Sequence, residues 1–367
     1  MKALDFFCGA GGLTRGLLDA GIEVVAGIDI DSNCLDTYVR NNPGAKFIRQ
    51  DISSIDTATL RELVGPIDPK DLLIAGCAPC QPFSKQRKPE QAKAKNRLRR
   101  QSDAKLLGEL CRIIELIKPA HVLVENVPGL VRIPGFSTYR RFVGMLRTNG
   151  YLIDEGVLDA KHFAVPQSRR RFVLMASRVK RVALPRPTHG PGLLPYKTVQ
   201  ESIAHYPPLS AGTRSAIIPN HVAACLSELN VPRIASTPVD GGDRRTWSDS
   251  LVLDCHKGEY DGHSDVYGRM FWNRPAPTLT SKCNSLSNGR YGHPEQNRAI
   301  SLREAASLQT FPDSYVFHGL DQQIARQIGN AVPVVFACAL GSALLSAPPK
   351  TVQQKRGTPE KQTQIHA

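Results

Sequence analysis

The chain has 367 residues, of which 41% are hydrophobic, so it is long enough for two domains and a sizeable core. Its net charge of +14 favours a polyanionic partner, and nine cysteines scattered through a long chain argue against a disulfide framework. Because no apolar run approaches membrane-spanning length and no signal peptide opens the chain, we expect a soluble cytoplasmic protein with no membrane partner.

The first half of the chain alternates short apolar runs with helical periodicity. Strands are predicted around Leu4 and over 22–28, 46–50, 71–76 and 121–126. Between them, helices are predicted from Leu13 to about Gly21 and over 32–42, 57–64 and 106–117. This alternation predicts an α/β fold with a doubly wound, mostly parallel sheet. Two more strand-like runs, near 151–159 and 171–176, would pair at the edge of the sheet.

Near Pro185 the composition changes: the chain becomes rich in proline and its apolar residues no longer recur at helical or strand spacing. We therefore predict a main domain over 1–184 and a second, smaller and irregular domain over 185–298. The chain would then return to the main domain over 299–346, through a helix with a Ser301–Glu304 capping box and a last helix over about 332–345. The polar tail 347–367 is predicted to be disordered.

Three successive strand ends carry residues suited to a nucleoside. The segment after the first strand contains Gly9, Gly11 and Gly12, which let a ligand approach the backbone at a helix N-terminus. Thr14 departs from the dinucleotide pattern G-x-G-x-x-G, which counts against NAD. Asp29 and Asp51 close the next two strands, where carboxylates can accept from ribose hydroxyls and an adenine amino group. Taken singly, these two Asp residues are more often helix caps.

Chemically reactive residues follow the next two strands. Cys80 comes after the strand 71–76, in Gly76-Cys77-Ala78-Pro79-Cys80-Gln81, and Glu125 ends the strand 121–126. A basic cluster, Gln167-Ser168-Arg169-Arg170-Arg171, opens a later strand. Singly, a buried inert Cys, a Glu–Asn cap and a solvated Arg cluster are the ordinary interpretations. Cys77 and Cys80 also form a C-x-x-C, so a dithiol or half of a zinc site is an alternative, although no second ligand pair at finger spacing accompanies it.

In this order, Pro-Cys-Gln, Glu-Asn-Val, Gln-Ser-Arg-Arg-Arg and the segment 327–333, Gln-Ile-Gly-Asn-Ala-Val-Pro, resemble the motifs of cytosine-5 DNA methyltransferases of the prokaryotic modification type. The resemblance covers nearly all of the chain outside about 185–268 and the tail. It implies a Rossmann-like methyltransferase fold and S-adenosylmethionine as cofactor, with no metal. The cofactor residues it implies are Phe7, Gly9, Gly11, Gly12, Asp29, Ile30, Asp51, Ile52, Pro79, Asn330 and Val332.

The resemblance also implies the chemistry. Cytosine C5 is a poor nucleophile, so a thiolate adds at C6 while an acid protonates N3. The resemblance makes Cys80 the nucleophile and Glu125 the acid, and it implies that Arg169 supports the bound base. The catalytic residues it implies further include Asn126, Gln167 and Arg171. The chain departs from the family at Cys8, Asp29 and Cys77-Ala78, where the family more often has Ala, Glu and a small residue followed by Pro.

DNA is the partner that the family implies, with the target base flipped out of the duplex. Candidate contacts are Ser84, Lys85, Arg87, Arg97 and Arg99 in a polar loop after Cys80, and Arg274, Thr278 and Thr280 at the end of the second domain. Further candidates for groove or phosphate contacts in that domain are Arg244, Arg245, His256, Lys257, Arg269, Lys282, Asn284, Asn288, Arg290 and His293. The ordinary interpretation of the polar loop is a solvated charge run.

Without an N-terminal regulatory extension, the chain resembles a prokaryotic or phage enzyme, which we expect to be monomeric and associated with the nucleoid. A cognate restriction endonuclease in the same system is a further expected partner. Two alternatives share the motifs. One is a tRNA cytosine-5 methyltransferase, although its usual Cys-Phe-Thr signature does not occur here. The other is a DNA-binding homologue that has lost turnover.

Overall fold

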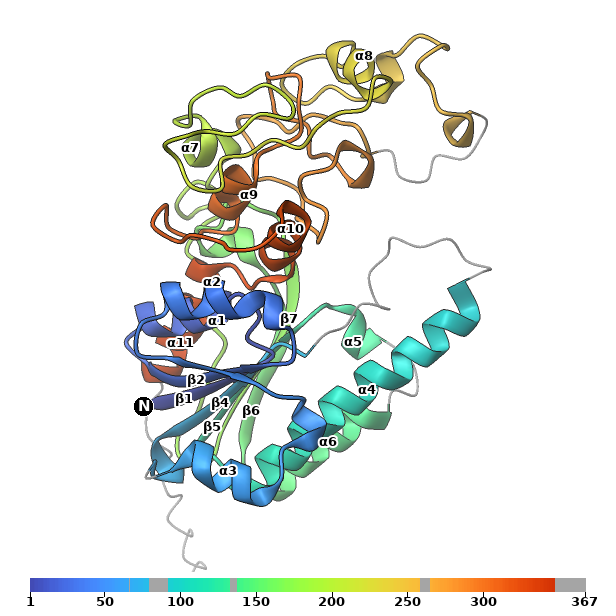
Figure 1. Ribbon diagram of the computed structural model, residues 1–367. Coiled ribbons are helices and arrows are strands. Elements are labelled where there is room, and N and C mark those ends of the chain that lie inside the picture. The colour runs from blue at the N-terminus through green and yellow to red at the C-terminus, as the bar shows by residue number, and fades with distance from the viewer. Residues whose placement is uncertain (66, 79–91, 133–136, 258–264, 347–367) are drawn as a thin grey trace, which may run out of the picture.

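The computed structural model describes residues 1–65, 67–78, 92–132, 137–257 and 265–346 (Figure 1). Its centre is a seven-stranded sheet in the order β3-β2-β1-β4-β5-β7-β6. The strands are β1 (Lys2–Phe6), β2 (Glu23–Asp29), β3 (Lys46–Arg49), β4 (Leu72–Gly76), β5 (His121–Asn126), β6 (Leu152–Asp159) and β7 (Arg170–Ser177). The first five pair in parallel, and β7 runs antiparallel between β5 and the edge strand β6. The predicted doubly wound, mostly parallel sheet is therefore confirmed.

The position of β1 determines where a ligand can bind. The chain passes from β1 to β2 and β3 on one side, and later to β4 and β5 on the other. In open α/β sheets, ligands bind beyond the carboxyl ends of the strands at the point where the strand order reverses. Here that point lies between β1 and β4, so the residues that follow these strands and β2 and β5 converge on one edge.

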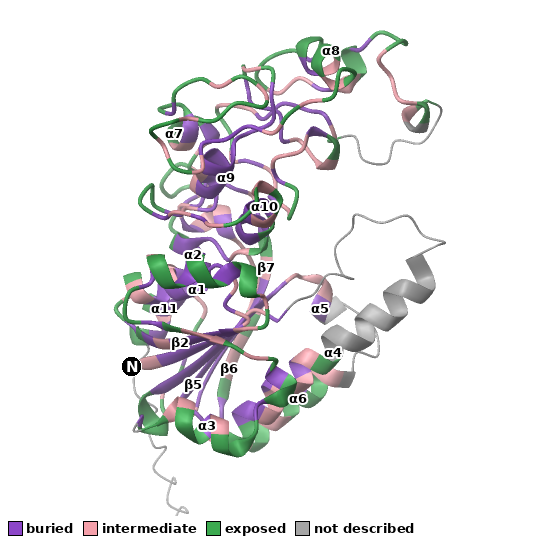
Figure 2. Cartoon of the chain, viewed as in Figure 1, coloured by how far each residue is buried: buried purple, intermediate pink, exposed green. Residues whose placement is uncertain are grey.

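Helices cover both faces of the sheet (Figure 1). One face carries α1 (Gly12–Asp19), α2 (Leu35–Asn41) and α11 (Val334–Ser346), and the other carries α3 (Thr57–Val64), α4 (Ala92–Ile117) and α6 (Ser137–Thr148). The alternation of side chains in β1 explains the division. Leu4 and Phe6 join the core with Ile113 of α4, whereas Ala3 joins the core with Leu17 of α1. The central strands are accordingly buried on both faces (Figure 2).

Residues 185–298, the predicted second domain, contain the short helices α7 (Val199–Ile203) and α8 (Asn230–Ala235). They are followed by α9 (Leu302–Leu308) and α10 (Asp321–Asn330), and α9 begins with the predicted Ser301–Glu304 capping box. One apolar core joins α7 to α9 and α10 and includes Leu279, so the segment after residue 298 first packs against the second domain before α11 returns to the sheet. A separate small cluster lies around α8 and contains Trp247 and Tyr267.

Several helices differ from the sequence-based expectations. The helix predicted over 106–117 is α4, which already begins at Ala92 and so contains Arg97 and Arg99, predicted to lie in a polar loop; residues 79–91 lie outside the described part. The helices α5 (Gly129–Arg132), α6, α7, α8 and α10 were not predicted. The predicted tail 347–367 also lies outside the described residues. In contrast, α3 and β5 have the predicted bounds.

One expectation about hydropathy is wrong. The stretch Asp321–Ser346, which spans α10 and α11, is long and apolar enough by composition to cross a membrane, and one window of 18 residues within it has a mean hydropathy of 1.9. However, 56% of that window is buried inside the protein. Gly16 of α1 lies against Ala337 of α11, and Gly341 of α11 lies against Ala20. Small residues therefore bring these two helices close together, which is the behaviour of a core helix.

Candidate active site

In the loop between β1 and α1, the backbone at Gly11 is tightly packed, whereas the backbone at Gly9 has free space beside it. A Cβ added to Gly11, which has a φ of 86°, would come within 2.6 Å of Asn42 Nδ2. A Cβ added to Gly9, with a φ of 50°, would meet no atom within 4 Å. Both positions favour glycine because of their positive φ. Only Gly9 leaves space over the backbone, as a loop that binds a ligand requires.

The carboxylate of Asp29 holds this loop in place. It accepts hydrogen bonds from the backbone N–H groups of Gly9 and Asp31, one on each oxygen and both at 2.8 Å. Burial raises the pKa of this carboxyl. Each carboxylate oxygen has a second lone pair, so further donors such as ribose hydroxyls can still be accepted. Ile30 is 62% exposed beside Asp29, and Phe7, with a φ of 61°, is partly buried. The structure therefore brings together the apolar and polar groups predicted for a nucleoside.

Asp51 and Ile52 lie at the end of β3. Asp51 Oδ1 accepts from the backbone N–H and the hydroxyl of Ser53, both at 2.8 Å, so the capping interpretation holds for this oxygen. These hydrogen bonds lower the pKa of the exposed Asp51 carboxyl. The side chain of Ile52 is 4% exposed and belongs to the core, so only its backbone is available to a ligand.

Behind the glycine loop lies Asp5, which the sequence analysis did not single out. Its side chain is fully buried in β1, and Thr14 Oγ1 donates to its Oδ2 at 2.7 Å. Among the described residues, Asp5 Oδ1 has no hydrogen-bond partner. Burial raises the pKa of this carboxyl to about 7, and Asp29 adds to the effect. The sequence did contain a sign of this buried carboxyl, because Asp5 is the single charged residue inside an apolar run.

The segment 330–332 lies against the start of α1. A Cβ added to Gly12 would come within 2.5 Å of the carbonyl oxygen of Val332. The Val332 side chain is buried in the core next to the sheet, and Asn330 is exposed at the end of α10. This segment therefore borders the glycine loop through its backbone.

The predicted acid, Glu125, is 2% exposed at the end of β5. Arg171 Nε lies 2.9 Å from Glu125 Oε1 and forms an ion pair, although Oε1 has no hydrogen-bond partner among the described residues. On the other oxygen, Cys77 Sγ lies 2.7 Å from Glu125 Oε2 in a hydrogen bond whose donor is the thiol. Burial raises the pKa of the Cys77 thiol well above its usual value, and the charge of Glu125 adds to the effect. The sequence analysis identified Cys77 only as part of the C-x-x-C.

Asn126 connects the ends of β4 and β5. Its Nδ2 donates to the carbonyl of Ala78 at 3.0 Å, and its Oδ1 accepts from the backbone N–H of Val127. Asn126 therefore fixes the path of the chain just before the predicted nucleophile. Pro79 and Cys80 themselves lie outside the described residues.

The guanidinium of Arg169 is buried among backbone carbonyls. It donates to the carbonyls of Leu279, Gly329 and Ala331 at 2.9 to 3.0 Å. Burial lowers its pKa to about 9, and the neighbouring Arg171 adds to the effect. The structure thus gives Arg169 a role in joining three segments, while Arg171 contacts Glu125.

Gln167 makes a second junction of the same kind. Its Oε1 accepts from the N–H of Leu279 at 3.0 Å, and its Nε2 donates to Gln309 Oε1 at 2.9 Å. Gln309, which the sequence analysis missed, donates in turn to the carbonyl of Ile328 at 2.6 Å. No short-range pattern identifies Gln309, because its partners lie far away in the chain.

The predicted DNA contacts are only partly described. Thr278 Oγ1 donates to the carbonyl of Ser168 at 2.6 Å, so it fixes the backbone of the basic cluster. Thr280 Oγ1 lies 3.3 Å from the hydroxyl of Tyr291, and the Arg274 guanidinium stacks over Phe271. Ser84, Lys85 and Arg87 lie outside the described residues, as do the side chains of Arg97 and Arg99 in α4.

Two of the further groove candidates in the second domain are wrong. Arg269 and His293 are 1% and 2% exposed. The Arg269 guanidinium donates to backbone carbonyls, among them those of Thr237 and Ile234 at 2.9 and 2.8 Å. It therefore holds this domain together from inside and is not available to a groove.

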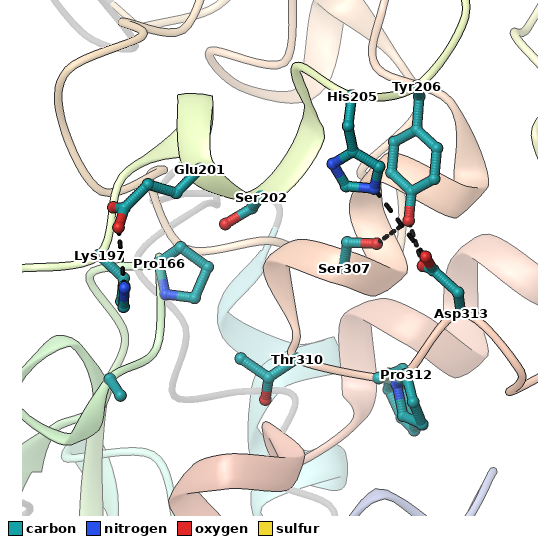
Figure 3. Close-up of a pocket in the computed structure, with 12 residues that line it drawn as sticks. Pro166, Lys197, Glu201, Ser202, His205, Tyr206, Ser307, Thr310, Pro312 and Asp313 are labelled. Atoms are coloured by element: carbon teal, nitrogen blue, oxygen red, sulfur yellow. Dashed lines mark hydrogen bonds and ion pairs between the residues drawn. The ribbon is translucent and has the colours of Figure 1, made fainter.

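A shallow surface pocket of about 400 Å³ lies elsewhere, between α7 and the segment after α9 (Figure 3). Its polar groups bind one another: the Tyr206 hydroxyl donates to Asp313, and Lys197 pairs with Glu201 at 2.8 Å. None of the residues predicted to hold the cofactor or the base lines it. Among the described residues, no group of three or more His, Cys, Asp or Glu is placed to hold a metal ion.

Comparison with known proteins agrees with this geometry. A family model described as C-5 cytosine-specific DNA methylase matches residues 1–346. The chain is 39% identical to the Type II methylase M.HgiDII of Herpetosiphon aurantiacus, over 93% of this chain and 94% of that protein. It is 31% identical to the Type II methyltransferase M1.HphI of Haemophilus parahaemolyticus, over 93% and 86% of the two chains.

Solved structures support the same fold. A DNA modification methyltransferase encoded within an E. coli prophage matches with a TM-score of 0.70 and 22% identity, covering 94% of this chain and 98% of that one. The Spodoptera frugiperda DNMT2 mutant matches with a TM-score of 0.61 and 17% identity, covering 94% and 99%. At these identities the likeness concerns the architecture alone.

Proposed function

Because the chain belongs to the C-5 cytosine-specific DNA methylase family, and is therefore a methyltransferase acting on cytosine in DNA, we propose a mechanism in which Cys80 bonds covalently to a flipped-out cytosine. The observation that carries the proposal is the ion pair that the buried Glu125, at the end of β5, makes with Arg171. It lies beside the end of β4, and the chain reaches Cys80 a few residues beyond that end.

S-adenosylmethionine is the proposed cofactor, which supplies an electrophilic methyl group. Support comes from the space over Gly9, the exposed Ile30 and the partly buried Phe7, which suit an adenine ring. Asp29 would accept from the ribose hydroxyls, and Asp51 from the adenine amino group. Gly11, Gly12 and the backbone of 330–332 would enclose the remainder, with Ile52 and Pro79 contributing main-chain contacts.

At the base, the proposed chemistry divides one difficult step into two. The Cys80 thiolate adds to C6 of cytosine while Glu125 gives a proton to N3, so that electron density collects at C5. After C5 has gained its methyl group, water removes the C5 proton. The C6–S bond then breaks, Cys80 leaves as a thiolate, and N3 returns its proton to Glu125. Arg171 orients Glu125 through their ion pair, and Asn126 fixes the backbone before Cys80.

We place sequence recognition in the second domain, because it joins the base-binding segment directly. Arg274, Thr278 and Thr280 lie at this connection, and Thr278 already holds Ser168. The basic residues after Cys80, namely Lys85, Arg87, Arg97 and Arg99, would contact the phosphates together with the hydroxyl of Ser84. We further propose a monomeric cytoplasmic enzyme of a restriction-modification system, accompanied by a cognate endonuclease.

The decisive experiment is to express the protein in a methylation-free host and sequence the methylated sites of its genomic DNA. We expect 5-methylcytosine within one short recognition sequence. Cys80→Ala should abolish the methylation and keep S-adenosylmethionine binding, as measured by calorimetry. Normal turnover of Cys80→Ala would falsify the covalent role. Methylation of tRNA but not of duplex DNA would favour the tRNA alternative, and no incorporation into any duplex would favour the inactive homologue.

A further inference from the structure

The glycine loop between β1 and α1 is held by two residues from distant parts of the chain. The N–H of Gly9 donates to Asp29, at the end of the neighbouring strand β2, at 2.8 Å. The carbonyl of the next residue, Ala10, accepts from the hydroxyl of Tyr315 at 2.5 Å. Tyr315 lies 305 residues further along the chain, between α9 and α10. The loop is therefore held by a segment outside the sheet as well as by the sheet itself.

The side chain of Tyr315 has little freedom to move. The residue is 2% exposed, and its ring packs against Phe311 and Phe317 with centroids 4.7 and 5.4 Å apart. Asn42, just after α2, donates to the hydroxyl oxygen at 3.0 Å, so the hydroxyl proton is left for the carbonyl of Ala10. Burial raises the pKa of Tyr315 above its ordinary value, so the hydroxyl keeps its proton at neutral pH.

The apolar core that joins α7 to α9 and α10 reaches the loop at the same point. Ala10 is 3% exposed and belongs to this core together with Tyr315. A Cβ added to Gly11 would lie 2.8 Å from the Tyr315 hydroxyl, whereas a Cβ added to Gly9 would meet no atom within 4 Å. These contacts fix the loop at Ala10 and Gly11 and leave the space over Gly9 open to a ligand.

We propose that Tyr315 is a positioning residue for the cofactor, because its hydroxyl holds the Ala10 carbonyl and so keeps the glycine loop in the conformation that receives S-adenosylmethionine. This inference rests on the proposed function, because it takes the glycine loop as the cofactor site. It assigns a role to a residue that the mechanism does not otherwise use. Without the hydroxyl, the loop moves until the buried carbonyl finds another donor. Cofactor binding must then reverse that movement, which lowers the apparent affinity.

Tyr315→Phe removes the hydroxyl and keeps the ring. We expect the dissociation constant for S-adenosylmethionine to rise about 5- to 20-fold, as the loss of one buried hydrogen bond implies. The bound cofactor restores the loop, and the described partners of the hydroxyl, Ala10 and Asn42, lie outside the base site. The KM for the cofactor should therefore rise with the dissociation constant, while kcat stays within about twofold.

Titration calorimetry measures the dissociation constant, and initial rates over a cofactor series give kcat and KM, with genomic DNA from a methylation-free host as substrate. Tyr206→Phe is the matched control. Its hydroxyl is bound by Ser307 and Asp313 in the same apolar core, and these partners are not residues of the glycine loop. Both variants should lower the melting temperature, but only Tyr315→Phe should change the affinity for the cofactor.

The measurements separate failure of the inference from failure of the proposed function. A higher dissociation constant and KM in Tyr315→Phe, absent from Tyr206→Phe, supports the inference, because a purely structural role would lower only the melting temperature. If Tyr315→Phe does not fold, Asn42→Ala removes the amide that orients the hydroxyl and should change the affinity in the same direction. An unchanged dissociation constant, or an equal rise in Tyr206→Phe, overturns the inference alone. If the unaltered protein binds no S-adenosylmethionine, the proposed cofactor is overturned and the inference with it.

Discussion

The side-chain amides of Gln167 and Gln309 are joined by a hydrogen bond of 2.9 Å, from Nε2 of the first to Oε1 of the second. Gln167 is the first residue of the basic cluster. Gln309 also donates to the carbonyls of Ile328 and Ala331, at the segment that borders the glycine loop. The two halves of the candidate active site are therefore connected by a short chain of buried hydrogen bonds.

Removing the amide of Gln309 should destabilise the protein. Gln309→Leu leaves Gln167 Nε2 and the Ile328 carbonyl buried without these hydrogen bonds, so we expect a loss on the order of 3 kcal/mol in the free energy of unfolding. Urea denaturation measures it. Gln200→Leu, at an exposed position of α7, is the matched control and should change stability by less than about 0.5 kcal/mol.

The same pair can be tested for coupling. If the bond between Gln167 and Gln309 carries the effect, the double variant Gln167→Leu/Gln309→Leu should be less destabilised than the sum of the single variants. Additive losses would show that the two amides act independently, and that the connection between the two halves lies elsewhere.

Gly12 should not tolerate a side chain. A Cβ there would meet the Val332 carbonyl at 2.5 Å, and that carbonyl belongs to backbone that cannot move away cheaply. We expect Gly12→Ala to lower both the melting temperature and the affinity for S-adenosylmethionine. Gly108→Ala, in α4 with no atom within 4 Å of the added Cβ, should instead be neutral or slightly stabilising, by up to about 1 kcal/mol. Equal effects of the two substitutions would contradict the proposed close approach.

Asp29→Asn should weaken cofactor binding. In the unaltered protein, the two carboxylate oxygens of Asp29 accept from the N–H groups of Gly9 and Asp31. The substitution keeps the size of the side chain but replaces one of these accepting oxygens by an amide NH2 group. We expect a dissociation constant for S-adenosylmethionine about 10- to 100-fold higher, as a charged hydrogen bond implies. Titration calorimetry measures it, with Asp36→Asn on the exposed side of α2 as control. An unchanged affinity would remove Asp29 from the cofactor site.

The buried Asp5 predicts a specific pH dependence of stability. Its pKa is about 7 in the folded protein against an ordinary value of 3.8, so the folded state binds more protons than the unfolded state between these values. The stability that this group contributes is thus fully present below its ordinary pKa. It is lost as the pH rises toward the pKa of the folded state, at a rate of up to about 1.4 kcal/mol for each pH unit.

Asp5→Asn isolates this contribution, because an amide oxygen can still accept from Thr14. As the pH rises from mildly acidic to mildly alkaline values, the melting temperature of the unaltered protein should fall more than that of the variant. If the melting temperatures of the two proteins changed with pH by the same amount, Asp5 would not change its protonation state in this range.

The sequence predicted best what is local. Residues at strand ends, such as Asp29 and Glu125, were recognised because a buried strand and the polar residue after it are contiguous in the chain. The role of Gln309 could not be predicted, because its partner Gln167 is 142 residues away. Arg269 was misjudged for a related reason: Arg is usually exposed, and the carbonyls that compensate its burial belong to distant segments.

Helices with few apolar residues were also missed. In α10 the buried face contains Ile324, Ala325 and Ile328, and polar residues make up most of the remainder. That stripe is too narrow to identify a helix by periodicity alone. In α4 the predicted start was late because the first turns are highly charged and contribute little apolar pattern.

The two apolar clusters of the second domain bear on how such enzymes can acquire new specificity. The larger cluster ties α7 and Leu279 to α9 and α10, so exchanging residues 185–298 for a foreign segment would cut through shared packing. The cluster around Trp247 and Tyr267 is smaller, with Arg233 over both rings, and the buried Arg269 ties it to His293 by donating to the carbonyls of Ile234 and His293. A chimera that exchanges the smaller cluster would cut less apolar packing than one that exchanges the larger, provided that Arg269 and the carbonyls it binds are kept.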